Sequence, residues 1–413
     1  MTQKEKFSIL PISSLFFAIT FLAIGYGMIL TFVGVYLKET GSSDIAIGII
    51  NAAFFLGAMA SSIFSQKIIS TIGHIRSFAT FASVMVVAFL LHAVFVSEIL
   101  WALLRFFSGF AYYGLLIILE SWLNEKSSTQ HRGKILATYS IIFYLSIAAG
   151  QFALNLQGEF YHTIFIIGSI LVLFSVVFIS MTKIKEPILK PFERYSFPKL
   201  YDIVPLALTS SFLGGFFVGG FFTMLPIYIL NIYASMEVVA MFMAVTILGG
   251  LMANWPIGML SDTYGRRKLI AASGFFTAAV SLLFVLLVPL FEGLIYILGF
   301  LLGAGMFCLY SLSLARANDM LDESKDVVEI SRSLLFTYGL GSFIAPLIIG
   351  FGLGMSNNFI FVLYVILGVF LGFYALSKKR VADDDLSVYV TVPVVSGASL
   401  PEIDPRQDED KSH

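Results

Sequence analysis

The feature that most constrains this chain is a series of apolar runs that recur almost from one end to the other. A helix needs roughly 20 apolar residues to cross the hydrocarbon layer of a membrane, and each run is about that long. Only 12% of the 413 residues are charged and 58% are hydrophobic, whereas a soluble domain carries about 25% charged residues. The sequence therefore predicts an all-α integral membrane protein.

The runs form two sets of six. The first six lie near residues 9–37, 44–65, 77–97, 99–123, 135–157 and 163–181, and the second six near 202–230, 237–260, 268–290, 293–317, 333–355 and 358–377. We expect an N-terminal six-helix bundle at 1–181, a cytoplasmic linker at 182–200, a C-terminal six-helix bundle at 201–377 and a disordered cytoplasmic tail at 378–413.

The positions of Lys and Arg predict the orientation, because basic residues near the ends of spans are retained in the cytoplasm. With the N-terminus inside, Lys38 alone among the 25 Lys and Arg residues falls in an outer loop, and Arg105 falls within a span. We expect a multi-pass monomer with both termini in the cytoplasm of a bacterial inner membrane, surrounded by the lipid bilayer and without a nucleic-acid partner.

A weak internal repeat supports two related halves. Gly109 and Asn124 bracket the fourth span with the same spacing at which Gly303 and Asn318 bracket the tenth. Proteins built from two such repeats usually bind a substrate at the interface between the repeats, near mid-membrane.

The sharpest motif is GMLSDTYGRRK, in the loop after the eighth span. Gly258 allows close helix packing, Asp262 can accept bonds from arginine or from a helix N-terminus, and Gly265 permits a tight turn. With Arg266 and Arg267, the motif resembles the G-x-x-x-D-x-x-G-R-R-K loop of the major facilitator superfamily. The resemblance implies two six-helix pseudo-repeat bundles that work as a transporter, with this loop as a latch.

The corresponding loop of the first half departs from that pattern. Ser70 stands where the resemblance would place the aspartate, while Gly73 and Arg76 remain. An ordinary basic loop that anchors the inner side of the membrane is the alternative interpretation.

Arg105 and Gly109 in the fourth span resemble the R-x-x-x-G motif of the same superfamily, whose arginine the resemblance associates with proton coupling. A buried arginine in hydrocarbon costs several kcal/mol unless it faces a cavity or a partner. We therefore assign Arg105 to coupling or substrate contact. An interhelical hydrogen-bond anchor, or a side chain that extends to the outer surface, is the alternative.

The E-S-W-L-N sequence that ends the fourth span, and A-R-A-N-D at the end of the tenth, are similar to the YcaD-type branch of the superfamily. Acidic and basic residues at these inner helix ends could pair and close an inner gate, or form simple helix-end ion pairs. The candidate pairs are Glu120 with Arg76 or Arg132, and Asp319 with Arg266 or Arg267.

Polar side chains inside the other spans are few. Tyr139, Tyr144 and Gln151 of the fifth span are weaker candidates for substrate contact, and aromatic and amide groups suit a neutral, zwitterionic or amphipathic solute. His92, alone in an apolar helix, is expected to be hydrogen-bonded and inert.

No enzyme motif is present: the chain lacks a Walker phosphate loop, an H-E-x-x-H sequence and a nucleophile elbow. Its single cysteine, Cys308, offers no metal-ligand spacing, so we expect no cofactor and no metal. We interpret the chain as a secondary active transporter that moves a small organic solute by alternating access, with protons as the coupling ion. The alternative is a non-transporting membrane sensor or assembly factor on the same fold.

Overall fold

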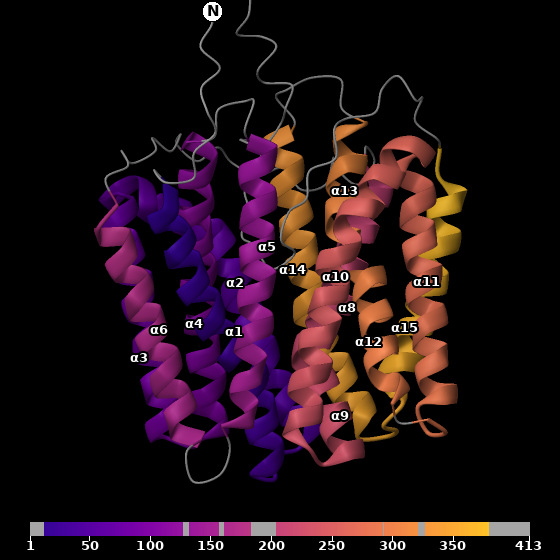
Figure 1. Ribbon diagram of the computed structural model, residues 1–413, viewed down its shortest axis with the longest axis horizontal. Helices are drawn as coiled ribbons and strands as arrows, with labels where there is room; N and C mark the ends of the chain where they lie inside the picture. The colour runs from indigo at the N-terminus through magenta and orange to yellow at the C-terminus, as the bar shows by residue number, and fades with distance from the viewer. Residues whose placement is uncertain are drawn as a thin grey trace, which may run out of the picture.

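The computed structural model describes residues 12–126, 132–156, 161–182, 204–291, 293–320 and 327–379. The helices stand side by side, with the indigo-to-magenta first half next to the second half, which runs from rose through orange to yellow (Figure 1). Within the described residues there are twelve helical segments long and apolar enough to cross a membrane, and no strand. The prediction of an all-α protein with twelve spans in two bundles is confirmed.

The first half contains six of these segments. They are α1 (Ser13–Glu39), α2 (Asp44–Ile72), α3 (His74–Val94), α4 (Glu98–Lys126), α5 (Arg132–Gln151), which continues into the short 3-10 helix η2 (Phe152–Asn155), and α6 (Tyr161–Ser180).

The second half contains the other six. They are α8 (Pro205–Thr223) with α9 (Leu225–Tyr233), α10 (Met236–Tyr264), α11 (Arg266–Leu287), α12 (Leu294–Met306) with α13 (Leu309–Asn318), α14 (Val327–Leu353) and α15 (Phe359–Ser377). The seventh span is thus two helices. Pro226 lies in the first turn of α9, and because proline lacks an N–H and its ring collides with the carbonyl four residues earlier, α8 ends just before it.

The two halves repeat the same turn. We call the end of the bundle at which α1 begins the proximal end, and the opposite end the distal end. At the proximal end a single glycine joins α2 to α3 and another joins α10 to α11. Gly73 has a φ of 86° and Gly265 a φ of 87°, a left-handed conformation that favours glycine.

A close approach of two helices is also repeated. A Cβ atom at Gly109 of α4 would lie 1.9 Å from the Phe54 carbonyl oxygen of α2, and one at Gly303 of α12 would lie 1.9 Å from the Thr246 carbonyl oxygen of α10. Small residues let membrane helices pack with their backbones in contact. The α2–α4 and α10–α12 pairs are therefore fixed by backbone packing.

The halves meet along α2 against α14 and along α5 against α10. At the distal end the first of these contacts is very tight. A Cβ atom at Gly48 would lie 2.4 Å from the Pro346 carbonyl oxygen, and one at Gly350 would lie 2.6 Å from the Asp44 carbonyl oxygen. The structure is therefore closed at this part of its distal end.

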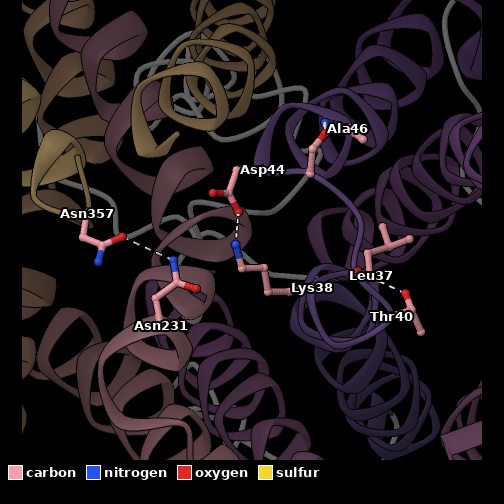
Figure 2. A network of polar contacts seen from close by, with 8 residues as sticks. Leu37, Lys38, Thr40, Asp44, Ala46, Asn231 and Asn357 are labelled. Atoms are coloured by element: carbon pink, nitrogen blue, oxygen red, sulfur yellow. Dashed lines mark hydrogen bonds and ion pairs between the residues drawn. The ribbon is translucent and has the colours of Figure 1, made fainter. Parts of the chain in front are cut away.

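Polar contacts lie beside this closure (Figure 2). Lys38, at the end of α1, pairs with Asp44, at the start of α2, with 2.6 Å between Nζ and Oδ1. In the second half the Asn231 amide donates to Asn357 over 3.5 Å. The ion pair fixes the loop that presents the first turn of α2 to α14.

Burial differs between spans in the way that a membrane bundle requires. The apolar window of the α8–α9 span is 94% buried, whereas those of α6 and α15 are 39% buried. The exposed surface of α6 and α15 carries large apolar side chains such as Phe174 and Phe373. The α8–α9 span is thus central, and α6 and α15 present apolar surface to lipid.

Candidate functional site

Arg105 lies buried in the first half. It is in the third turn of α4, which places it about 10 Å from the distal helix end at 1.5 Å per residue. Its exposure is 1%. Nη2 donates to Oδ1 of Asn51 on α2 over 3.1 Å, and the guanidinium lies 4.7 Å from the centroid of the Phe54 ring. No carboxylate of the described residues forms an ion pair with Arg105.

Aromatic rings surround this arginine. Tyr26 of α1 stacks on Tyr112 of α4 at a centroid distance of 3.6 Å and on Phe54 at 5.5 Å. We call Tyr26, Asn51, Phe54, Arg105 and Tyr112 the Arg105 cluster. Four of its buried polar atoms have no hydrogen-bond partner among the described residues: both tyrosine hydroxyls, Nδ2 of Asn51 and Nε of Arg105.

Sequence reasoning identified Arg105 but missed its aromatic neighbours. An aromatic side chain in an apolar run has the same appearance whether it fills a core or lines a site. Asn51 carried a signal, because an amide inside a span needs a partner. That partner could not be named without the fold.

The three candidates on α5 have different surroundings. Gln151 accepts a hydrogen bond from Thr31 (2.7 Å) and donates to the carbonyls of Gly27 (3.0 Å) and Ile147 (3.3 Å). These bonds use both amide protons and join α5 to α1, which indicates a structural anchor. Tyr144 meets Phe307 of the second half edge to face, at 5.8 Å between centroids, so it lies where the two halves touch.

Tyr139 belongs to a second polar group, nearer the proximal end. Its hydroxyl donates to Oε1 of Glu120 over 2.7 Å, and Glu120 is only 4% exposed. This hydrogen bond links α4 to α5. The Arg76 side chain is exposed, and its pairing with Glu120 stays a prediction. The Arg132 side chain lies outside the described residues.

The loop motif of the second half forms an ionic network at the proximal end. Arg266, the first residue of α11, is fully buried and pairs with Oδ1 of Asp262 at 2.5 Å and with Oδ2 of Asp319 at 3.6 Å. It also donates to the hydroxyl of Ser261, which in turn donates to the Gly258 carbonyl over 2.7 Å. The network joins α10, α11 and the end of α13.

Arg267 has a separate role. Its Nη1 donates to the Lys378 carbonyl over 2.6 Å and to the Leu376 carbonyl over 3.4 Å, at the C-terminal end of α15. Arg316 of α13 donates to the Lys379 carbonyl over 2.8 Å. Asp319 thus pairs with Arg266. The Glu120–Tyr139 hydrogen bond joins two helices of the first half and the Asp319–Arg266 ion pair lies in the second half, and the gating role of these residues stays a prediction.

Comparisons with known proteins agree with this architecture. A family model described as Major Facilitator Superfamily matches residues 15–346. Two curated relatives, from Salmonella arizonae and Salmonella typhimurium, are both named "Uncharacterized MFS-type transporter YcaD". Each is 23% identical over 340 residues, which cover 81% of this chain and 87% of the relative.

Two solved structures share the fold. The nucleoside transporter NupG aligns with a TM-score of 0.72 and 15% identity, over 89% of this chain and 99% of that chain. A D-xylose-proton symporter aligns with a TM-score of 0.68 and 12% identity, over 94% of this chain and 99% of that chain. Together with the family match, the two-bundle fold shows that the chain belongs to the major facilitator superfamily, a family of membrane transporters rather than enzymes.

Proposed function

We propose that this protein is a secondary active transporter that moves a small organic solute across the bacterial inner membrane by alternating access, driven by protons. The observation that carries the proposal is the Arg105 cluster: inside one bundle of a two-bundle protein lie a buried cation and polar atoms that have no partner among the described residues. Isolated buried polar groups are costly, and a bundle that only needed stability would not place them there.

Two features support alternating access. The halves touch through tight α2–α14 contacts at the distal end, and Tyr144 meets Phe307 across the interface. Rocking of one bundle on the other would open these contacts in turn and expose a site between them. With both termini in the cytoplasm, as the distribution of Lys and Arg favours, the distal end is the outer face.

Proton coupling needs a group that gains and loses a proton during the cycle. Arginine stays protonated in proteins, so Arg105 can contribute only its fixed charge. Glu120 is a buried carboxyl that accepts a hydrogen bond from Tyr139, and its side chain can titrate. We assign the coupled proton to Glu120, and solute contact to Arg105 with Tyr144.

Flux in proteoliposomes tests the proposal. Purified protein is reconstituted with a total metabolite extract of bacterial cells inside the vesicles, and solutes that leave are identified by mass spectrometry. We expect one solute class to leave only from vesicles that contain the protein, and to accumulate against its gradient when a proton gradient is imposed. Loss of that accumulation with a protonophore supports coupling. No protein-dependent flux of any solute would favour a sensor or assembly factor on the same fold.

A further inference from the structure

We propose that the Arg105 cluster binds the carboxylate of a small aromatic monoanion, and that such an acid is the solute of this transporter. The inference rests on the proposed transport function and specifies its substrate class. Three properties of the cluster support it: its charge, its surplus of hydrogen-bond donors and its stacked rings.

Among the described residues, no acidic side chain pairs with the charge of the cluster. The Arg105 guanidinium is 1% exposed, and its described contacts are the neutral amide oxygen of Asn51 and the face of the Phe54 ring. A buried charge without a counter-ion is costly, and an anionic ligand removes that cost. Because the cluster holds one cation, it matches one negative charge, and a dianion would bring an unmatched charge into the same place.

The unpartnered atoms are mainly donors. Nε of Arg105 and Nδ2 of Asn51 can only donate, and the hydroxyls of Tyr26 and Tyr112 can donate as well. The amide oxygen of Asn51, the one acceptor-only atom in the cluster's side chains, already accepts from Arg105. An ionised carboxylate only accepts, and arginine binds it through charge-assisted, often bidentate, bonds. A protonated amine is a hydrogen-bond donor and would face mainly donors in this cluster.

The rings favour a planar body behind the carboxylate. Tyr26 stacks on Tyr112 at a centroid distance of 3.6 Å, and Phe54 lies beside both, 5.5 Å from Tyr26 and 6.3 Å from Tyr112. Aromatic rings gain energy from offset stacking beyond the area that they bury. Because these rings are buried and already in contact, a ligand reaches Arg105 only where they separate. A flat aromatic acid then replaces the stacking contact that is lost, whereas a short aliphatic acid does not.

The cluster is not needed to hold its helices together. The bond between Arg105 and Asn51 joins α4 to α2, but these helices are already in backbone contact where Gly109 approaches Phe54 and where Gly57 approaches Phe106. An anchoring role for Arg105 would therefore repeat what the α2–α4 backbone contacts already do without burying a charge. This distinguishes the binding role from the anchoring role.

Binding of defined acids to the purified full-length protein in lipid nanodiscs tests the inference. The probes are benzoate and indole-3-acetate, with benzamide and indole-3-acetamide as uncharged analogues, acetate as an acid without a ring and phthalate as a dianion. We expect saturable binding of at least one aromatic monoacid, and affinity lower by about thirtyfold or more for its amide, because removing one partner of a buried charge pair has effects of that size.

Variants of Arg105 separate charge from geometry. Arg105→Gln keeps a donor for Asn51 and should lose the discrimination between acid and amide. Arg105→Lys keeps the charge without the planar fork and should bind the acid with intermediate affinity. Ser108→Ala is the matched control, since Ser108 lies on the same helix and bonds the Leu104 carbonyl, and it should bind as the wild type does.

Thermal stability without ligand gives a readout that does not depend on the probe. If the charge serves a ligand, Arg105→Gln should melt at or above the wild-type temperature. A large fall in melting temperature would identify Arg105 as an anchor and overturn the inference. So would the absence of saturable binding by both aromatic acids, or equal binding of acid and amide. Flux of a neutral solute that is insensitive to Arg105→Gln would refute this inference while leaving the proposed transport function intact.

Discussion

Gly48→Ala should shift the protein away from its distally closed state. The added Cβ would lie 2.4 Å from the Pro346 carbonyl oxygen, whereas ordinary contact begins at 3.4 Å, so α2 and α14 must separate by about 1 Å. Overpacking of this kind costs about 1–3 kcal/mol. Alanine also favours helix over glycine, but α2 stays helical in both states and that gain cancels. The closed state should therefore lose about 5- to 150-fold in relative population.

Labelling by a membrane-impermeant maleimide measures this shift. Cys308, the single cysteine, is replaced by serine, and Thr223→Cys provides a buried reporter where α8 approaches Gly34 of α1. The reporter should react faster from the distal side in the Gly48→Ala protein, by up to the same 5- to 150-fold. Gly293→Ala is the matched control, because a Cβ at Gly293 would meet nothing within 4 Å. Equal labelling of both variants would refute the role of the α2–α14 contact in distal closure.

Four further substitutions test the polar groups. Asp319→Asn should destabilise the protein by about 3–5 kcal/mol, because it removes a carboxylate from the buried Arg266, and the melting temperature should fall. Asp262→Asn should destabilise the protein by about 1 kcal/mol or less, since the Asp262 side chain is 48% exposed. A larger effect at Asp262 would contradict this order. Glu120→Gln should abolish proton-driven accumulation in proteoliposomes but retain solute exchange, and unchanged accumulation would exclude Glu120 as the proton carrier. Gln151→Leu should lower stability by about 1–2 kcal/mol through lost α1–α5 bonds, with solute affinity unchanged; a selective loss of affinity would instead place Gln151 at the solute.

The fold was predictable because one physical requirement governs it. A helix that crosses lipid must be apolar over about 20 residues, and turns must contain residues that suit water or tight bends. The apolar runs that meet this requirement can be recognised in the local sequence, and so can the glycines of the repeated turns. The break of the seventh span near Pro226 also follows from local chemistry. No long-range information was needed for any of these features.

The site was predictable only in part, because its contacts join residues that are distant in sequence. Arg105 stood out as a charge in an apolar run, but its partner Asn51 lies on another helix. Gln151 stood out as an uncharged polar side chain in a span, although its amide is hydrogen-bonded to Thr31 and Gly27 of α1. A polar side chain in a span needs a hydrogen-bond partner, and only the folded structure shows whether another helix supplies it or a solute could.

The two proximal loops make the same turn although their sequences differ. By sequence the first-half loop retains little of the second-half motif, because Ser70 replaces the aspartate. Yet Gly73 and Gly265 make the same turn, and each is followed by a buried basic residue, His74 in one half and Arg266 in the other. His74 hydrogen-bonds the Ser121 hydroxyl over 3.0 Å, where Arg266 pairs with carboxylates. Because the shared turn and buried position do not require those carboxylates, loss of charge at Asp319 should destabilise the second half and leave the packing of the first-half loop unchanged.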